Sequence, residues 1–154
     1  MKICRFLNED RIIPGLDPGT KEEVLRKFIM ILNKRKLIHN PEEVLTKILD
    51  REHLGSTALN QEIAVPHALI SNLENTFIAM GILKEKMNFG IDKEKPVSIL
   101  ILLLGNKDNP GQQLKILAHI CRLIKETEVV SKIKQAENLD DICRRIEEEE
   151  SKII

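Results

Sequence analysis

Two kinds of hydrophobic pattern alternate along the chain. Apolar residues recur at helical spacing in three segments, residues 24–32, 44–49 and 114–124. Two other segments are nearly continuous apolar runs, residues 77–83 and 97–104. Helical spacing predicts an amphipathic helix, and a short continuous run is typical of a strand covered on both faces. The alternation predicts an α/β fold, a sheet with helices on both faces, as a single domain over residues 1–154.

Polar residues indicate where two of the helices begin and end. Thr20 is followed three residues later by Glu23, which is the pattern of a capping box. Asn40 precedes Pro41, a cap residue followed by proline at the first helical position. The helix that starts there should end near Arg51. Further elements are predicted from similar signals: short strands at 12–15 and 63–65, a loop at 105–111, and helices at about 112–125, 129–136 and 140–149.

Composition excludes several classes of function. The chain has 24 basic and 24 acidic residues, so its net charge of zero gives no field that would attract nucleic acid. Four Phe with no Trp or Tyr give no surface for stacking bases. The longest apolar run, residues 97–104, is too short to span a bilayer, and the first residues lack the apolar core of a secretion signal. We therefore expect a soluble, cytoplasmic protein with no membrane insertion.

No motif in the chain indicates a metal or a cofactor. Three cysteines, Cys4, Cys121 and Cys143, have neither metal-ligand nor redox spacing. No His-x-x-x-His pair occurs on a predicted helix, and Ser56 lacks the flanking glycines of a nucleophile elbow. A glycine-rich phosphate loop is also missing. We expect no cofactor and no metal.

Candidate chemistry gathers instead around one histidine. His67 directly follows Pro66 at the end of a polar segment, and Arg51 lies sixteen positions earlier. Neutral imidazole is a nucleophile near neutral pH, and the arginine fork suits phosphate oxygens. The pattern suits a histidine that briefly carries an anion. A structural histidine is the ordinary alternative, and the residues alone leave it open.

The other three histidines carry weaker signals. His39 lies in a connection, and His53 just past a helix end, where packing or capping explains it. A helical wheel with Leu117 at its origin puts His119 about 200° round, off the apolar stripe. His119 is thus either a solvated surface residue or a residue that faces a cleft together with His67.

The central motif of the chain consists of three segments, Arg51-Glu52, Ser56-Thr57 and Ile63-Ala64-Val65-Pro66-His67-Ala68. This motif resembles the signature of the fructose–mannitol class of EIIA domains of the bacterial phosphoenolpyruvate:sugar phosphotransferase system, which includes the nitrogen-type EIIA regulators. Weaker matches flank the motif, at residues 13–16, 20–25 and 96–97 and in the helix that contains His119. The resemblance covers nearly the whole chain, and it implies a mixed sheet sandwiched between helices.

The resemblance also implies roles. His67 is similar to the phosphorylated histidine, whose Nε2 takes the phosphoryl group from the carrier HPr and passes it to an EIIB component. Arg51 resembles the arginine that accompanies it, and His119 resembles a second histidine lining the site. Three functions stay open: a component that feeds a sugar permease, a nitrogen-type regulator acting through phosphorylation-dependent protein contacts, and a phosphorylation-dead module of the same fold. The printed chain carries no EIIB-like or permease segment, which favours a stand-alone component.

The chain departs from the family pattern shortly before His67. Where relatives often have glycines, it reads Ala58-Leu59-Asn60-Gln61-Glu62. A positive φ is unfavourable for Glu62, and its charge would repel a phosphoryl group if it faced the site. We expect Glu62 to point to solvent, because short polar loops usually expose their charges.

Overall fold

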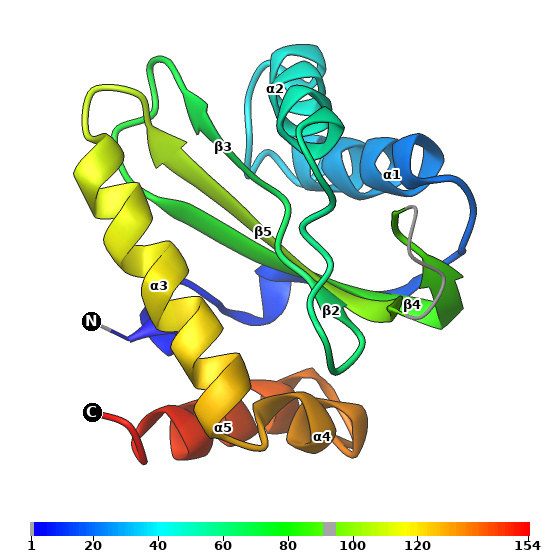
Figure 1. Ribbon diagram of the computed structural model, residues 1–154, viewed down its shortest axis with the longest axis vertical. Helices are drawn as coiled ribbons and strands as arrows, with labels where there is room; N and C mark the ends of the chain where they lie inside the picture. Colours follow the sequence, from blue (N-terminus) through cyan, green and yellow to red (C-terminus); the bar gives the residue numbers. More distant parts are fainter. Residues whose placement is uncertain (1, 91–94) are drawn as a thin grey trace.

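The computed structural model describes residues 2–90 and 95–154 (Figure 1). Its elements, after two 3₁₀ turns at Ile3–Arg5 and Glu9–Arg11, are β1 (Ile12–Leu16), α1 (Lys21–Lys34), α2 (Pro41–His53), β2 (Ile63–Ala64), β3 (His67–Ile70), β4 (Phe77–Asn88), β5 (Pro96–Asn106), α3 (Pro110–Glu126), α4 (Val129–Lys134) and α5 (Leu139–Glu150). None of the helices in these described ranges is both long and apolar enough to cross a bilayer.

The sheet is mixed. Its strands lie in the order β1-β4-β5-β2, and β3 pairs with β5 beyond β2. Only β4 and β5 are antiparallel to each other, whereas β1 is parallel to β4, and β2 and β3 are parallel to β5. Helices α1 and α2 cover one face, and α3, α4 and α5 cover the other (Figure 1). The expected fold class, a mixed sheet between helices, is confirmed.

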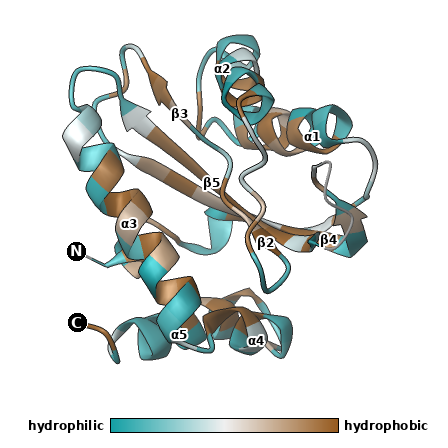
Figure 2. Ribbon diagram, viewed as in Figure 1, coloured by the Kyte–Doolittle hydropathy of each residue, from teal (hydrophilic) through white to brown (hydrophobic). Residues whose placement is uncertain are grey.

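Two separate cores explain the continuous apolar run of β5. Leu100, Leu102 and Leu104 pack into the core under α1 and α2, whereas Ile101 and Leu103 pack into the core under α3 to α5. Successive side chains of a strand point to opposite faces, so a strand covered on both faces must be apolar at every position. Figure 2 shows the corresponding brown β5, and helices α1 and α3 with one apolar and one polar side.

The helix-start signals are confirmed, with one correction. Thr20 Oγ1 accepts from Glu23 N while the Glu23 carboxylate accepts from Thr20 N, so the capping box is formed. Pro41 occupies the first turn of α2, but Asn40 is left-handed at φ 51° and its side chain makes no capping hydrogen bond. In the left-handed conformation the side chain points away from the first turn of the helix. Asn40 therefore sets the direction in which the chain enters α2 and does not cap the helix. Helix α2 ends at His53, two residues after the expected Arg51.

Helix α3 and strands β4 and β3 also differ from the sequence prediction. Helix α3 begins at Pro110, and the Asn109 side chain caps it by accepting from Gln112 N at 3.3 Å. Strand β4 continues to Asn88, because its pairing with β5 shifts register after Ile82 and resumes at Met87 and Asn88, beyond polar residues that carry no apolar signal. Strand β3 was not expected, since four residues after a proline give too short a pattern.

Candidate functional site

His67 is the first residue of β3, and it pairs in register with Leu103 of β5. Ala68 and Ile70 of the same strand enter the core under α1 and α2. Because side chains alternate along a strand, His67 points to the opposite face, the one that α3 covers. The ring is partly buried. Its position on a paired strand fixes the ring more firmly than a loop would.

A single hydrogen bond decides which nitrogen of His67 is available. Nδ1 lies 2.8 Å from the carbonyl oxygen of Val65. A carbonyl can only accept, so Nδ1 carries the hydrogen and donates it. In the neutral ring Nε2 then keeps a free lone pair. Nε2 is therefore the atom able to attack an electrophile.

Arg51 lies in the last turn of α2, the helix that packs against β3. Its Nη1 donates to the carbonyl of Gly55 at 2.9 Å. This bond fixes the guanidinium over the loop that leads out of α2 and uses one of its five N–H donors. A guanidinium held in this way has further donors for an anion.

Glu52, next to Arg51, also binds the loop between α2 and β2. Its carboxylate is buried at 5% exposure and accepts from the backbone N and the Oγ1 of Thr57. Lys21 of α1 completes the set at 2.9 Å. Thr57 in turn accepts from Val65 N at 3.2 Å through its own carbonyl. Hydrogen bonds thus run from α2 through the loop to Val65, whose carbonyl orients His67.

Ser56 ties this loop to the sheet. Its Oγ donates to the carbonyl of Phe89 and accepts from Ala58 N, both at 3.1 Å. The Arg51-Glu52 and Ser56-Thr57 pairs of the motif therefore have one structural result. They fix the loop between α2 and β2 on which the placement of His67 depends.

The expectation that Glu62 points to solvent is wrong. Its carboxylate binds Lys86 of β4 through one oxygen and Lys134 of α4 through the other, and only 19% of the side chain is exposed. Hydrogen bonds from Lys134 and then Lys86 hold the pKa of Glu62 below its usual value. Gln61 and Glu62 are both left-handed, at φ 73° and 67°. The two lysines hold in place a backbone form that glycine would adopt more easily.

His119 has a partner of its own, in a different part of the molecule. Its Nε2 lies 2.7 Å from Glu150 Oε2 of α5, and its side chain is only 14% exposed. Glu150 is fully buried and also accepts from the backbone N of Ile3 and Cys4. Of the two positions left open for His119, the solvated surface is therefore wrong. His119 joins α3 to the ends of the chain, and no hydrogen bond among the described residues links it to His67.

The wheel failed because Leu117 is not the centre of the buried stripe of α3. Its fully buried residues are Gln113, Ile116, Ile120, Leu123 and Ile124. On this wheel His119 lies about 40° from Leu123 and about 60° from Ile116, and Glu150 of α5 contacts that side of the helix. Six residues separate His119 from Gln113, which is about 9 Å along a helix axis.

Gln113 is the site neighbour that the sequence did not reveal. Its Nε2 donates to the carbonyl of Ala68, the residue after His67, at 3.2 Å. Its Oε1 is buried and has no hydrogen-bond partner among the described residues. Gly105 lies directly beneath, where a methyl group would come within 2.2 Å of that oxygen. A buried polar residue on an otherwise apolar stripe is the signal that could have identified it.

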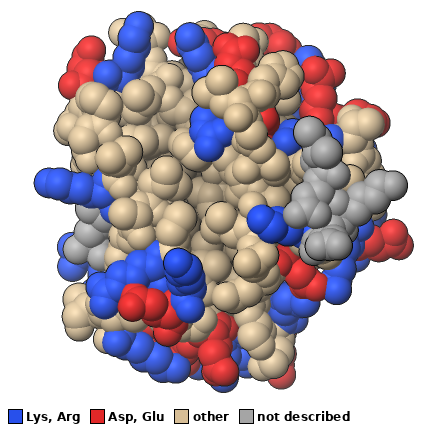
Figure 3. All heavy atoms as spheres, viewed as in Figure 1, with Lys and Arg blue, Asp and Glu red and all other residues tan. Residues whose placement is uncertain are grey.

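The face over β3 and α3 is mainly uncharged. Figure 3 shows an uncharged centre, with Lys, Arg, Asp and Glu gathered around its margin. Leu54, at the end of α2, is 84% exposed and Leu114 of α3 is 68% exposed. Both come from helices that contact β3. An uncharged patch with a charged margin is typical of a surface that meets another protein.

The cysteines and acidic residues do not form a further centre. Burial raises the pKa of the Cys4, Cys121 and Cys143 thiols, and hydrogen bonding to Glu150 adds to the effect at Cys4. Within residues 2–90 and 95–154, no group of three His, Cys, Asp or Glu side chains is placed to hold a metal ion.

Two curated proteins illustrate what the chain is similar to. It is 27% identical over 143 residues to a nitrogen regulatory protein of Bradyrhizobium diazoefficiens, covering 92% of both chains. It is 25% identical over 142 residues to the fructose-specific EIIABC component of Bacillus subtilis, covering 92% of this chain and 22% of that protein. The chain thus spans nearly all of the first protein and about a fifth of the second.

Solved structures show the same fold. The nitrogen regulatory protein IIA-Ntr of Neisseria meningitidis superposes with a TM-score of 0.82 at 21% identity, covering 94% of this chain and 98% of that one. Mannitol-specific IIA of Escherichia coli, in complex with phosphorylated mannitol-specific IIB, superposes with a TM-score of 0.73 at 21% identity, covering 92% and 97%.

A family profile joins the motif and the fold. The profile described as phosphoenolpyruvate-dependent sugar phosphotransferase system, EIIA 2, matches residues 5–149, a range that includes Arg51, His67, Gln113 and His119. The chain belongs to this EIIA 2 family of the phosphotransferase system.

Proposed function

We propose that the protein is a phosphoryl carrier that accepts a phosphoryl group from phospho-HPr on His67 and passes it to an EIIB component. The hydrogen bond from His67 Nδ1 to the Val65 carbonyl carries the proposal, because in the neutral ring it leaves the lone pair of Nε2 free to attack phosphorus. In this proposal residues 1–154 act as one phosphotransfer domain in the cytoplasm.

The transfer is a displacement at phosphorus. The Nε2 lone pair of His67 forms the new P–N bond, and the P–N bond to the donor histidine breaks, with its electron pair returning to the donor ring. Arg51 compensates charge on the equatorial oxygens, and the Val65 carbonyl stabilises the positive charge that develops on the ring. The reverse displacement, with an acceptor as nucleophile, discharges His67.

The uncharged face supports a carrier role. A carrier must bind a donor and an acceptor in turn through one surface, so it needs a patch that makes weak and transient contacts. The exposed Leu54 directly follows α2 and the exposed Leu114 lies on α3, and both helices contact β3. The complex of a structural neighbour with a phosphorylated IIB protein supports EIIB as the class of acceptor.

The test is incubation with phosphoenolpyruvate, Enzyme I and HPr, followed by intact mass measurement. We expect one acid-labile phosphoryl adduct in the wild-type protein and none in His67→Ala. His53→Ala is the matched control and should be phosphorylated normally. An adduct that persists in His67→Ala would refute the assignment, and no adduct on the wild-type protein would favour the phosphorylation-dead module.

A nitrogen-type regulator is the second candidate. The observation that favours it is the relative from Bradyrhizobium diazoefficiens, of which this chain covers 92%. Both candidates require phosphorylation of His67 and differ in the use made of the phosphoryl group. A carrier discharges to EIIB, whereas a regulator binds a target protein in only one of its two phosphorylation states.

A further inference from the structure

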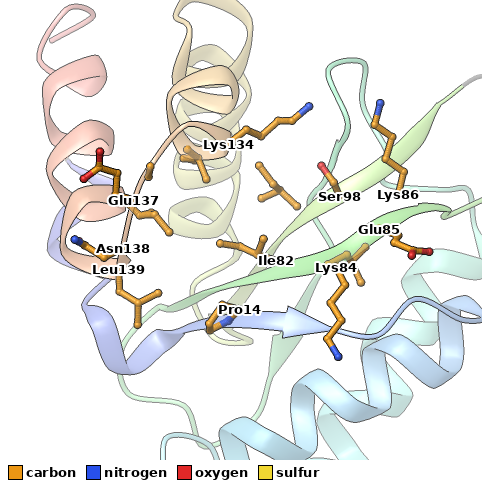
Figure 4. Close-up of a pocket in the computed structure, with 15 residues that line it drawn as sticks. Pro14, Ile82, Lys84, Glu85, Lys86, Ser98, Lys134, Glu137, Asn138 and Leu139 are labelled. Atoms are coloured by element: carbon orange, nitrogen blue, oxygen red, sulfur yellow. The ribbon is translucent and has the colours of Figure 1, made fainter.

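A groove of about 630 Å³ lies between β4, β5 and the turn that joins α4 to α5 (Figure 4). Its floor is aliphatic and consists of Ile82, Ile99, Ile133, Leu139 and Ile142. Its volume falls within the roughly 300–1,000 Å³ that is typical of small-molecule sites. The groove is separate from the phosphotransfer site, because Ile99 and Leu103, which pairs with His67, lie about 13 Å apart along β5.

One end of this groove is polar and positively charged. Lys86 and Lys134 extend there in Figure 4, and both bind the carboxylate of Glu62, one on each oxygen. Two ammonium groups and one carboxylate leave this cluster with one net positive charge. Figure 4 shows the side chains of Lys84 and Glu85 extending away from this end. Lys84 also has its own partner, Asp17, at 2.9 Å.

Ser98 adds an unused hydrogen-bonding group at the same end. Its Oγ is buried and has no partner among the residues that the structure describes. Its backbone N donates to the Glu62 carbonyl at 2.8 Å, which places Ser98 beside the residue that the two lysines bind, and Figure 4 shows its side chain at the same end as Lys134 and Lys86. A buried hydroxyl is usually hydrogen-bonded, and one that has no partner beside a groove indicates a place for a ligand group or a water molecule.

We propose that the groove binds a small aliphatic carboxylate. The two lysines already hold a carboxylate, that of Glu62, with one ammonium group on each oxygen, so their spacing suits this group. A ligand carboxylate competes with Glu62 for Lys86 and Lys134 and accepts from Ser98 Oγ. Its hydrocarbon chain covers the aliphatic floor, which gives the favourable burial of apolar surface.

Binding has a local consequence in the loop before β2. Glu62 is left-handed, and its two ion pairs hold it there. A ligand that displaces the carboxylate removes these ion pairs and leaves the strained backbone free to relax. The ligand and the Glu62 carboxylate therefore compete for the same two lysines, and a variant in which the ion pairs of Glu62 are weaker must bind the ligand more tightly.

The test is a titration of the unphosphorylated protein with octanoate, followed by methyl NMR, with octan-1-ol as the uncharged control. We expect saturable shifts of the methyl groups of Ile82, Ile99 and Ile133, and at least fivefold weaker binding of octan-1-ol. The titration involves neither HPr nor His67, so its failure and that of the proposed phosphotransfer are distinguishable.

Four variants examine the charged end. Lys134→Gln should weaken octanoate binding about tenfold, the loss expected for one charge-assisted hydrogen bond, and Ser98→Ala about threefold. Glu62→Gln should tighten it about threefold or more, because an uncharged amide competes poorly for ammonium groups. Lys84→Gln is the control and should bind as the wild type. Equal affinities for octanoate and octan-1-ol, an unchanged affinity in Lys134→Gln, or shifts confined to residues outside the groove would each overturn the proposal.

Discussion

Replacing Gly105 by Ala tests whether the buried amide beside His67 is fixed in place. A methyl group at Gly105 would lie 2.2 Å from Gln113 Oε1 and 2.7 Å from its Cδ, far inside contact distance. Gln113 is 6% exposed and bonded to Ala68, so it has no open space to enter. We expect Gly105→Ala to destabilise the protein by about 2 kcal/mol, as in an overpacked core. The melting temperature should then fall by about 4–8 °C.

A double-mutant cycle attributes this loss to the contact. Gln113→Ala alone removes one methylene group and the carboxamide with its buried hydrogen bond to Ala68, which should destabilise the protein by about 2–3 kcal/mol. In the double variant the new methyl group occupies part of the space that Gln113 leaves. We therefore expect the double variant to be destabilised by about 2–3 kcal/mol in total, less than the sum of the two single losses. The difference is a coupling energy of about 2 kcal/mol.

Gly111→Ala is the matched control. Its methyl group would have only Asn109 Oδ1 nearby, at 4.0 Å, and alanine favours a helix by up to about 1 kcal/mol over glycine. Because the chain has no Trp or Tyr, far-UV circular dichroism should follow urea unfolding. The reasoning is refuted if the single losses add to within about 0.5 kcal/mol, or if Gly105→Ala is as stable as Gly111→Ala.

Three further predictions address Arg51, His119 and Glu62. Arg51→Ala should slow phosphorylation of His67 about 10²–10³-fold, the usual effect of losing one electrostatic donor, with unfolding unchanged; a wild-type rate in quenched-flow transfer from phospho-HPr would exclude this role. His119→Gln should lower the melting temperature and leave the transfer rate intact, because its ring binds Glu150; a slower rate at unchanged stability would restore the role implied by family resemblance. Lys134 and Lys86 lower the pKa of Glu62 in the folded protein. Its ion pairs therefore stabilise the fold fully at pH values above the usual carboxyl pKa of 4.5, and this stabilisation is lost as the pH falls through the lower pKa of the folded state. Urea unfolding should therefore show a stability difference between wild type and Glu62→Gln near neutral pH that disappears in acid, and a constant difference would contradict it.

The fold was largely predictable because its strongest patterns are local. Residues 97–104 are apolar at every position, and the structure gives a reason, a core on each face of β5. The capping box of Thr20 and Glu23 likewise depends on neighbours in sequence. Strand β3 could not be predicted in this way, because its pairing partner β5 is distant in the chain and its own four residues show no clear period.

The candidate site was predictable only where a motif carried it. His67 and Arg51 came from the sequence, whereas Gln113 did not, because an amide on a helix has no chemical signature until its surroundings are known. His119 was misplaced for a related reason. A wheel gives angles but not the element that covers each side, and α5 covers the side that seemed open.

The pairing pattern of the sheet has a consequence for how the protein folds. The hairpin of β4 and β5 joins strands that are adjacent in sequence, whereas Ile12 must find Met80 and His67 must find Leu103 across long stretches of chain. Closing a long loop is entropically costly before its contacts form, so parallel pairs with distant partners form slowly. The strand that begins with His67 should therefore dock on a hairpin that is already present. A nascent chain would place His67 late, after the centre of the sheet has formed.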